Sequence, residues 1–360
     1  MITGQLDKAH KFGDLVPKIV EKYPKSKCNG SAMYVYLAFI YWRKNRLVDY
    51  AEGLEKALPL CLGYGDMIFA AYCCYQRIIC FIIGAAPLDI SAEKIIKYFE
   101  FIDRHKITSI LDIAYPFVQY IKCLRGQTES PSSFNDNKFN EEAYKNNEKN
   151  PNALFTFHLC KAMALFYNCY YRRAFVHIKK AEENLSFVSG TILVPHFHFF
   201  YGIILGVLLS EEKDAEDDNR IKLTPASPTE DTRKQNILTL EKHWKILRDY
   251  SFENYGMFQH KILLLEAEFL RAQKLPEDSK LLHIYDVSVS FARKERYYHI
   301  ETIAQERIAT YYLRSKKMNY SASLIFQECY GNYLQWGAKF KIENLKFNYG
   351  SMLQSQQVSV

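Results

Sequence analysis

Two groups of histidines in this 360-residue chain have the residue types that could bind a metal or transfer a proton. His196 and His198 flank Phe197, and they could share a metal ion if the segment were extended. His260 precedes Lys261, and the pair could act as a general base and its modulator. Both groups lie in apolar stretches, which favours histidines packed or hydrogen-bonded in a core. We therefore predict no catalytic, cofactor-binding or metal-binding residue.

The motifs by which enzymes hold phosphate or activate a nucleophile are absent from the sequence. It contains no G-x-x-x-x-G-K-[ST] loop, no G-x-G-x-x-G loop, no H-R-D or D-F-G triplet, no G-x-S-x-G elbow and no H-E-x-x-H. Glu266 and Glu268 are two residues apart, so their carboxylates would not face each other on a helix. The sequence therefore indicates a protein that acts by binding, without a cofactor.

Charge and cysteine usage narrow the class of protein further. Lys and Arg outnumber Asp and Glu by 47 to 40, and a net charge of +7 is too small for a dedicated nucleic-acid binder. The nine cysteines form no C-x-x-C pair and no zinc-like spacing, which favours buried, reduced thiols. Residues 1–13 lack the apolar run of a secretory signal. We expect a cytoplasmic protein that does not bind nucleic acid.

Two apolar stretches, Met67 to Leu88 and Ile192 to Leu209, approach the length of a membrane-spanning helix. Gln76 and Arg77 interrupt the first, and an arginine at the bilayer centre costs about 2.5 to 3.5 kcal/mol on insertion scales. Pro195 and two histidines interrupt the second. Inner helices that pack on both sides have the same all-round apolar character, so we predict no membrane insertion.

The elements that must position these residues are helices, because apolar residues recur at helical spacing and hairpin signals for strands are scarce. The fold class is predicted to be all-α, a TPR-like α/α superhelix of degenerate helical hairpins. The clearest hairpin has Ala162 and Leu165 on its first helix, a turn at Tyr170-Tyr171, and a second helix with small or apolar residues at the seam. These are Ala174, Ile178 and Ala181.

The pattern divides the chain into six parts. The first helical hairpins occupy residues 14–125, TPR-like helices 153–209 and the last hairpins 236–349. A polar linker is predicted over 126–152, where Ser, Pro, Asn, Lys and Glu are frequent. Eight acidic residues and two prolines make 210–235 an acidic, flexible insertion, and 350–360 a tail. Basic clusters at Arg314 to Lys317 and at Lys339, Lys341 and Lys346 are interpreted as helix surface.

Several strings also resemble a known family. In the last third they are Gln259-His260-Lys261 to Leu265-Glu266-Ala267-Glu268, Ile284-Tyr285-Asp286 to Phe291-Ala292, Glu301 to Ala309 before Tyr311-Tyr312-Leu313, and the ending Tyr333-Leu334-Gln335-Trp336-Gly337-Ala338-Lys339 to Leu345. Upstream they are Gly65-Asp66, Ala70-Ala71-Tyr72, Gly84 and Leu88, then Gln119 and Leu124 to Thr128. The chain thereby resembles, from about residue 14 to residue 349, the helical-repeat region of large multidomain sensor kinases.

The resemblance implies a non-catalytic partner of catalytic domains. In that family a Ser/Thr-kinase-like domain and an AAA-type (STAND) ATPase precede the repeats, and a GAF domain and a histidine kinase usually follow. The matching strings are structural, so no catalytic residue can be carried over to this sequence. Trp336 would be an apolar anchor, Gly337 a helix end, and Lys339 and Lys341 surface residues.

Three functions are compatible with these observations. The first is a non-catalytic, helical-repeat interaction and regulatory module of a two-component or related signal-transduction protein, binding a protein partner or adjacent kinase and ATPase domains. The second is a fragment of an ATP-dependent histidine kinase whose catalytic domains lie outside this chain. The third is a sensor that holds a small molecule or peptide between hairpins, near His196, His198 or His260.

Overall fold

The computed structural model describes residues 6–84, 86–148, 150–210, 230–251, 254–274 and 278–353, and every regular element in these ranges is helical. The α-helices are α1 (Leu6–Gly13), α2 (Leu15–Lys22), α3 (Asn29–Phe39), α4 (Leu47–Gly63), α5 (Met67–Ile83), α6 (Leu88–Arg104), α7 (Thr108–Leu124), α8 (Glu141–Asn147), α9 (Pro151–Tyr167), α10 (Tyr171–Glu183), α11 (Leu193–Leu209), α12 (Glu230–Ser251), α13 (Tyr255–Gln273), α14 (Asp278–Lys294), α15 (Tyr298–Ser315), α16 (Asn319–Trp336) and α17 (Lys339–Leu353). Short 3-10 helices, η1 (Tyr41–Arg43) and η2 (Leu185–Val188), accompany them.

The helices form a TPR-like α/α superhelix, as predicted. Except around α8, each long helix packs against the helix before it and the helix after it. The first helices of successive pairs also contact one another, from α3 through α5, α7, α9, α11 and α13 to α15. These inner helices make the continuous core, while α4, α6, α10, α12, α14 and α16 lie outside them.

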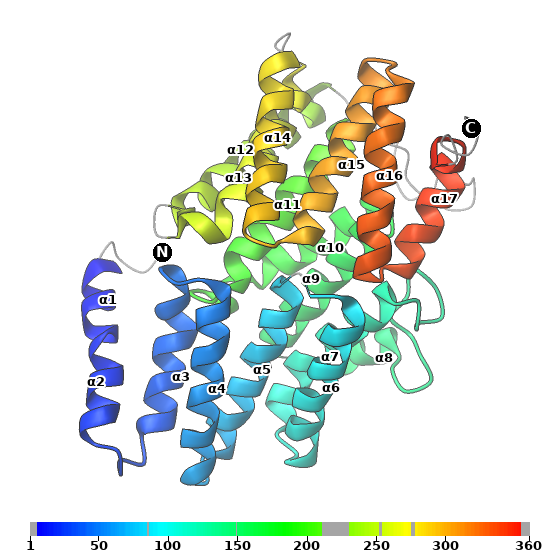
Figure 1. Cartoon of the computed structure of the whole chain (residues 1–360). Helices are drawn as coiled ribbons and strands as arrows, with labels where there is room; N and C mark the ends of the chain where they lie inside the picture. Colours follow the sequence, from blue (N-terminus) through cyan, green and yellow to red (C-terminus); the bar gives the residue numbers. More distant parts are fainter. Residues whose placement is uncertain are drawn as a thin grey trace, which may run out of the picture.

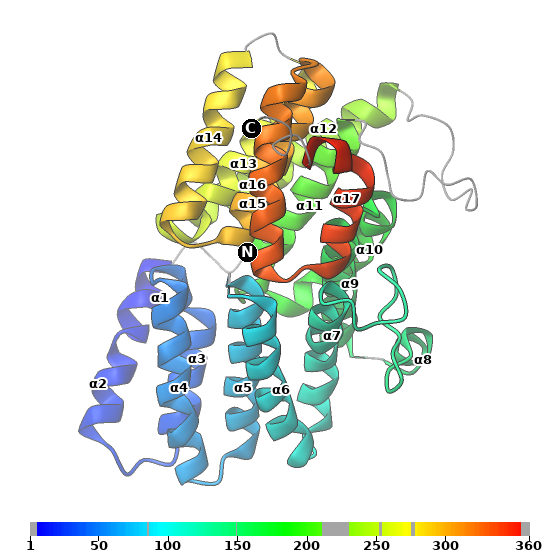
Figure 2. The same ribbon diagram turned by 45° about the vertical axis from the view of Figure 1, so that its right-hand side comes forward.

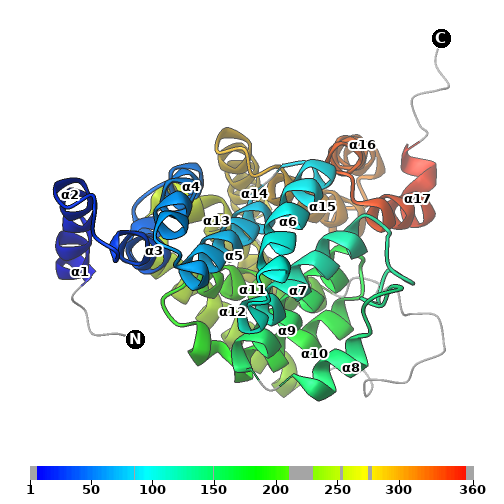
Figure 3. The same cartoon turned by 90° about the horizontal axis from the view of Figure 1, so that it is seen from below.

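The superhelix is arranged in two tiers. Figure 1 shows α1 to α7 below, α12 to α16 above, and α9 to α11 connecting the two, and the turned view in Figure 2 agrees. Seen from below, α2 to α7 follow an arc that continues into α9 and α10 (Figure 3). The last hairpins therefore return over the first ones, and residues far apart in the chain meet at the seam between the tiers.

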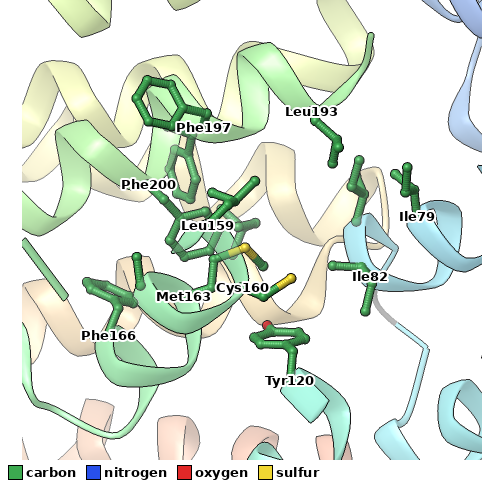
Figure 4. Packing of buried hydrophobic residues seen from close by; sticks show 14 of the residues in the cluster. Ile79, Ile82, Tyr120, Leu159, Cys160, Met163, Phe166, Leu193, Phe197 and Phe200 are labelled. Carbon is green, nitrogen blue, oxygen red and sulfur yellow. The ribbon is translucent and has the colours of Figure 1, made fainter. Parts of the chain in front are cut away.

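The inner helices are buried nearly all round. In α11 every residue except Leu208 is buried, and α9 is almost as enclosed. Figure 4 shows Leu159 and Met163 of α9 beside Phe200 of α11, with Ile79 and Ile82 of α5 at the far side of the same cluster. This double packing explains the two stretches that resemble membrane helices. Among the described helices, none has both the length and the apolar composition that a membrane crossing requires.

One turn geometry recurs between helices. A single left-handed residue stands two positions after one helix and two before the next at Gly65, Lys106, Cys169, Arg296 and Lys317. At the first four turns, the next residue's N–H donates to the carbonyl five positions back, at 2.8 to 3.4 Å. This is the Schellman helix ending, which normally uses glycine. Four of the five residues are not glycine, so the fold accepts strain there.

This geometry predicts opposite effects for two matched substitutions. A Cβ added at Gly65, where φ is +72°, would meet nothing within 4 Å, so Gly65→Ala should lower the free energy of unfolding by about 1 kcal/mol through backbone strain alone. Lys106→Gly, at φ +52°, should raise it by up to about 1 kcal/mol. Urea unfolding followed by circular dichroism measures both. A loss of stability in the Lys106 variant would contradict this account.

The structure corrects parts of the predicted organisation. The supposed polar linker over 126–152 contains α8 and the start of α9, and its aromatic residues Phe134 and Phe139 are buried in the core. Asn140 and Asn150 cap these two helices, because each side chain accepts a backbone N–H of the first turn. Of the supposed acidic insertion, residues 211–229 lie outside the described residues, and 230–235 are helical in α12. Eight cysteines are buried as predicted, whereas Cys28 is exposed.

Candidate functional site

A cleft of about 660 Å³ opens at the seam between the two tiers. Its lower wall comes from the start of α4 and the end of α5, and its upper wall from the start of α13 and the turn between α14 and α15. The apolar residues of this lining include Leu47, Ala51, Phe81 and Met257. Ligand sites in proteins commonly have volumes of roughly 300 to 1,000 Å³, so the cleft has room for a small molecule or a few residues of a peptide.

Asn254 joins the two walls. Its side-chain amide donates to the carbonyl oxygens of Trp42 and Asn45, at 3.0 and 2.6 Å, while its oxygen accepts the N–H of Met257 and caps α13. Trp42 is fully buried and stacks on Tyr250 at a ring-centre distance of 6.2 Å. The first turn of α13 is thus fixed to residues more than two hundred positions earlier, which holds the cleft's walls together.

Four basic side chains line the cleft, against the one carboxylate of Glu295. Two of the four are already paired within the lower tier. Arg46 makes two 2.8 Å bonds to Asp49, and Arg77 makes a 2.6 Å bond to Glu55. The other two, Lys294 and Arg296, have no ion-pair or hydrogen-bond partner for their side chains among the described residues. The upper wall therefore carries two exposed cations, with the carboxylate of Glu295 between them in the sequence.

Tyr297 is the most enclosed polar residue of the lining. It is only 7% exposed, yet its hydroxyl has no hydrogen-bond partner in the described part of the chain. Burial, with a smaller contribution from the Glu295 carboxylate, raises the pKa of Tyr297, so the hydroxyl stays protonated and can donate. The ring stacks on His260 at 4.4 Å, and the Nζ of Lys261 lies 5.5 Å from its centre.

Behind Tyr297 the structure gathers four basic side chains in the core. They are His196 of α11, His260 and Lys261 of α13, and His299 of α15, and we call them the histidine–lysine cluster. The three imidazoles are buried with no hydrogen-bond partner for any ring nitrogen. Burial lowers the pKa of His299 to about 3 and that of Lys261 to about 7, and holds those of His196 and His260 well below 6.5. At neutral pH the imidazoles are uncharged.

His196 and His198, the two histidines that flank Phe197, do not form a common site. They lie on helix α11, not on an extended segment, so the metal site considered for them is not formed. His198 instead bonds His243 of α12, Nδ1 to Nδ1, at 2.8 Å. An equivalent bond of 2.9 Å joins His158 and His177 in the hairpin of α9 and α10. In the described ranges, no three His, Cys, Asp or Glu side chains are arranged to hold a metal ion.

Sequence reasoning missed the buried ion pairs. Glu268 is fully buried, and its two oxygens accept from Nε and Nη2 of Arg307, both at 2.8 Å. Lys341, predicted as surface, is 2% exposed and contacts Glu306 at 2.5 Å and the sulfur of Cys169 at 3.2 Å. The prediction for Lys341 is therefore wrong, because α17 packs this side chain between α15 and the turn that joins α9 to α10. The sequence signal that could have predicted these buried ion pairs is a charged residue inside an apolar helical stretch.

The ending singled out in the sequence has the predicted structural role. Trp336 is 7% exposed and packs against Tyr167 of α9, with 5.0 Å between the ring centres. Gly337 ends α16 in the left-handed conformation, with φ +91°. This ending joins the last hairpin to the middle of the superhelix.

Comparison with known proteins adds no relative: no family model matches the chain, and no curated protein matches it. The candidate site is therefore defined by its own geometry, which is that of a binding cleft.

Proposed function

We propose that this chain is a non-catalytic, helical-repeat interaction module of a signal-transduction protein, and that it binds an acidic segment of a protein partner or of an adjacent kinase or ATPase domain. The observation that carries the proposal is the cleft, where Lys294 and Arg296 have no partner. An anionic segment would supply the missing charge from outside the chain. Cytoplasmic location and a sensor-kinase context belong to the same proposal.

The position of the cleft supports a regulatory role. A bound segment would contact the lower tier at Val48 and the upper tier at Arg296 at the same time. Anything that binds this closed arrangement better than an open one stabilises it by mass action. The partner would thereby be coupled to the relative position of the first and last hairpins.

Photo-crosslinking from the cleft tests the proposal. Val48 lines the cleft and is 51% exposed, so a photoreactive residue placed there in the full chain should crosslink one protein or domain in the native cell. Arg296→Glu should reduce that crosslink by about tenfold or more through charge repulsion, whereas Lys106→Glu, at the equivalent position of another turn, should not. A crosslink that is unaffected by the Arg296 change, or absent, would overturn the proposal.

The alternative is that the chain is a fragment of an ATP-dependent histidine kinase whose catalytic domains lie outside it, and a nucleotide site in the cleft would be an addition to that hypothesis. The observation that would favour a nucleotide in the cleft is its basic lining, which could contact phosphate groups. Under our proposal, ATP with Mg²⁺ should leave the thermal unfolding midpoint of the purified chain unchanged. A rise in the midpoint that Arg296→Glu abolishes would favour the alternative instead.

A further inference from the structure

The donors without partners in the cleft are adjacent along the chain. Lys294 ends α14, Arg296 stands at the left-handed position of the turn, and Tyr297 precedes α15. The Schellman bond from the Tyr297 N–H to the Ala292 carbonyl, at 2.8 Å, fixes this backbone. Lys294, Arg296 and Tyr297 thus line one cleft from a short segment whose backbone this bond holds.

We infer that these three groups bind a phosphate monoester, carried by a phosphorylated side chain of the partner segment; the inference rests on the proposed function. Clusters of Arg and Lys are the usual recognition element for such groups, and a guanidinium matches two phosphate oxygens at once. Tyr297 would donate to a third oxygen. Tyr297 lines the cleft, and its hydroxyl has no hydrogen-bond partner within the described residues.

The charge of the cleft favours phosphate over a carboxylate. A phosphate monoester carries about −1.5 to −2 at pH 7, so it attracts Lys294 and Arg296 more strongly than a single carboxylate does. Arg46 and Arg77 already have Asp49 and Glu55, so they add little further demand for negative charge. Glu295 opposes any anion, and its removal should therefore strengthen binding.

The space around these groups fits a side chain with its flanking backbone. The apolar lining residues Leu47, Ala51 and Phe81 would contact a neighbouring aliphatic or aromatic residue of the same segment. A free phosphate ion would leave these residues uncovered. We therefore expect the peptide to bind more tightly than the isolated phosphoamino acid.

Fluorescence polarisation with the full chain tests the inference. The probes are labelled degenerate peptide libraries with a fixed central phosphoserine, serine or glutamate. We expect the phosphoserine library to bind at least about tenfold more tightly than the glutamate library, and free O-phospho-L-serine to compete at higher concentration. Tyr297→Phe should weaken phosphoserine binding by about tenfold or more, because it removes one hydrogen bond to a charged group. Glu295→Gln should strengthen it.

Matched variants keep the result interpretable. Arg296→Gln should weaken binding as Tyr297→Phe does, whereas Lys106→Gln, at the equivalent turn position between α6 and α7, should bind as the unaltered chain. The unfolding midpoint of every variant shows whether it is folded under the assay conditions. Equal affinity for the phosphoserine and glutamate libraries, or no effect of Tyr297→Phe, would overturn the inference. In that case a charge-dependent crosslink from position 48 would still support the proposed function.

Discussion

Arg307→Met should lower the free energy of unfolding by about 3 to 5 kcal/mol, because it would leave the Glu268 carboxylate buried without its cation. The two side chains are 2% and 0% exposed, so water cannot replace the lost bonds. Glu268 also accepts the hydroxyl of Tyr285 at 2.5 Å, and Arg307 donates to Ser210 at 2.7 Å. The substitution therefore disturbs a network that joins the end of α11 to α13, α14 and α15.

Urea unfolding followed by circular dichroism measures this effect, and a double substitution is the control. Replacing a whole buried pair by apolar residues is often close to neutral, whereas removing one partner is not. Glu268→Met together with Arg307→Met should therefore recover more than half of the stability lost in the single variant. A single variant that loses less than about 1 kcal/mol would show that water or rearrangement satisfies Glu268.

The second large effect is acid sensitivity. Burial holds the pKa of seven histidines below 6.5, and brings it to about 4 for His158 and His198. The others in this set are His177, His196, His243, His260 and His299. Between pH 6.5 and about 4 the unfolded chain binds protons that the folded chain excludes. The contribution of these histidines to stability is thus complete above pH 6.5, and it falls as the pH is lowered through this window.

The size of the acid effect follows from the number of groups. Each histidine that stays neutral in the folded chain lowers the free energy of unfolding by up to about 1.4 kcal/mol for every pH unit below 6.5. A few such histidines together therefore approach the total free energy of unfolding of a domain, which is roughly 5 to 15 kcal/mol. We expect the unfolding midpoint in urea to fall steeply from pH 6.5 to pH 5. Replacing the His198 and His243 pair by Phe and Leu should make that decline shallower. An unchanged midpoint over this range would contradict the burial of neutral imidazoles.

Lys261 extends the same reasoning to higher pH. Burial alone lowers its pKa from 10.5 to about 7, and the described residues provide it with no carboxylate, only the rings of Phe199 and Tyr297 and three neutral imidazoles. The unfolded chain keeps its Lys261 proton up to pH 10.5, so stability should rise from pH 7 towards pH 10. Lys261→Met should remove that rise while preserving the decline in acid. This variant separates the lysine from the histidines.

Helical periodicity was sufficient to predict the fold. Small and apolar residues such as Ala174, Ile178 and Ala181 are buried at the seam of α9 and α10 as predicted, because neighbouring repeats interact locally along the chain. The same logic explains the all-round apolar character of α11, because this helix packs on both sides. Local patterns carry this information, since each helix mainly packs on its neighbours in sequence.

The candidate site could not be predicted in the same way. Its residues come from four places in the chain, and only the return of the upper tier over the lower one brings Arg46 near Tyr297. Sequence reasoning did single out His196, His260 and Lys261, and the structure brings these three together, but it missed His299 and it placed Lys341 on the surface. Closure of the superhelix is a long-range property, and no local spacing encodes it.

Because His299 stacks on Trp336, tryptophan fluorescence can report on the interior of this protein. The two rings are nearly parallel, at 22°, with 5.9 Å between their centres, and Tyr167 also contacts the indole, with 5.0 Å between the ring centres. A neutral imidazole quenches indole emission weakly, and a protonated one quenches it strongly. The fluorescence of Trp336, in a chain whose other two tryptophans have been replaced, would thus report on the protonation of His299.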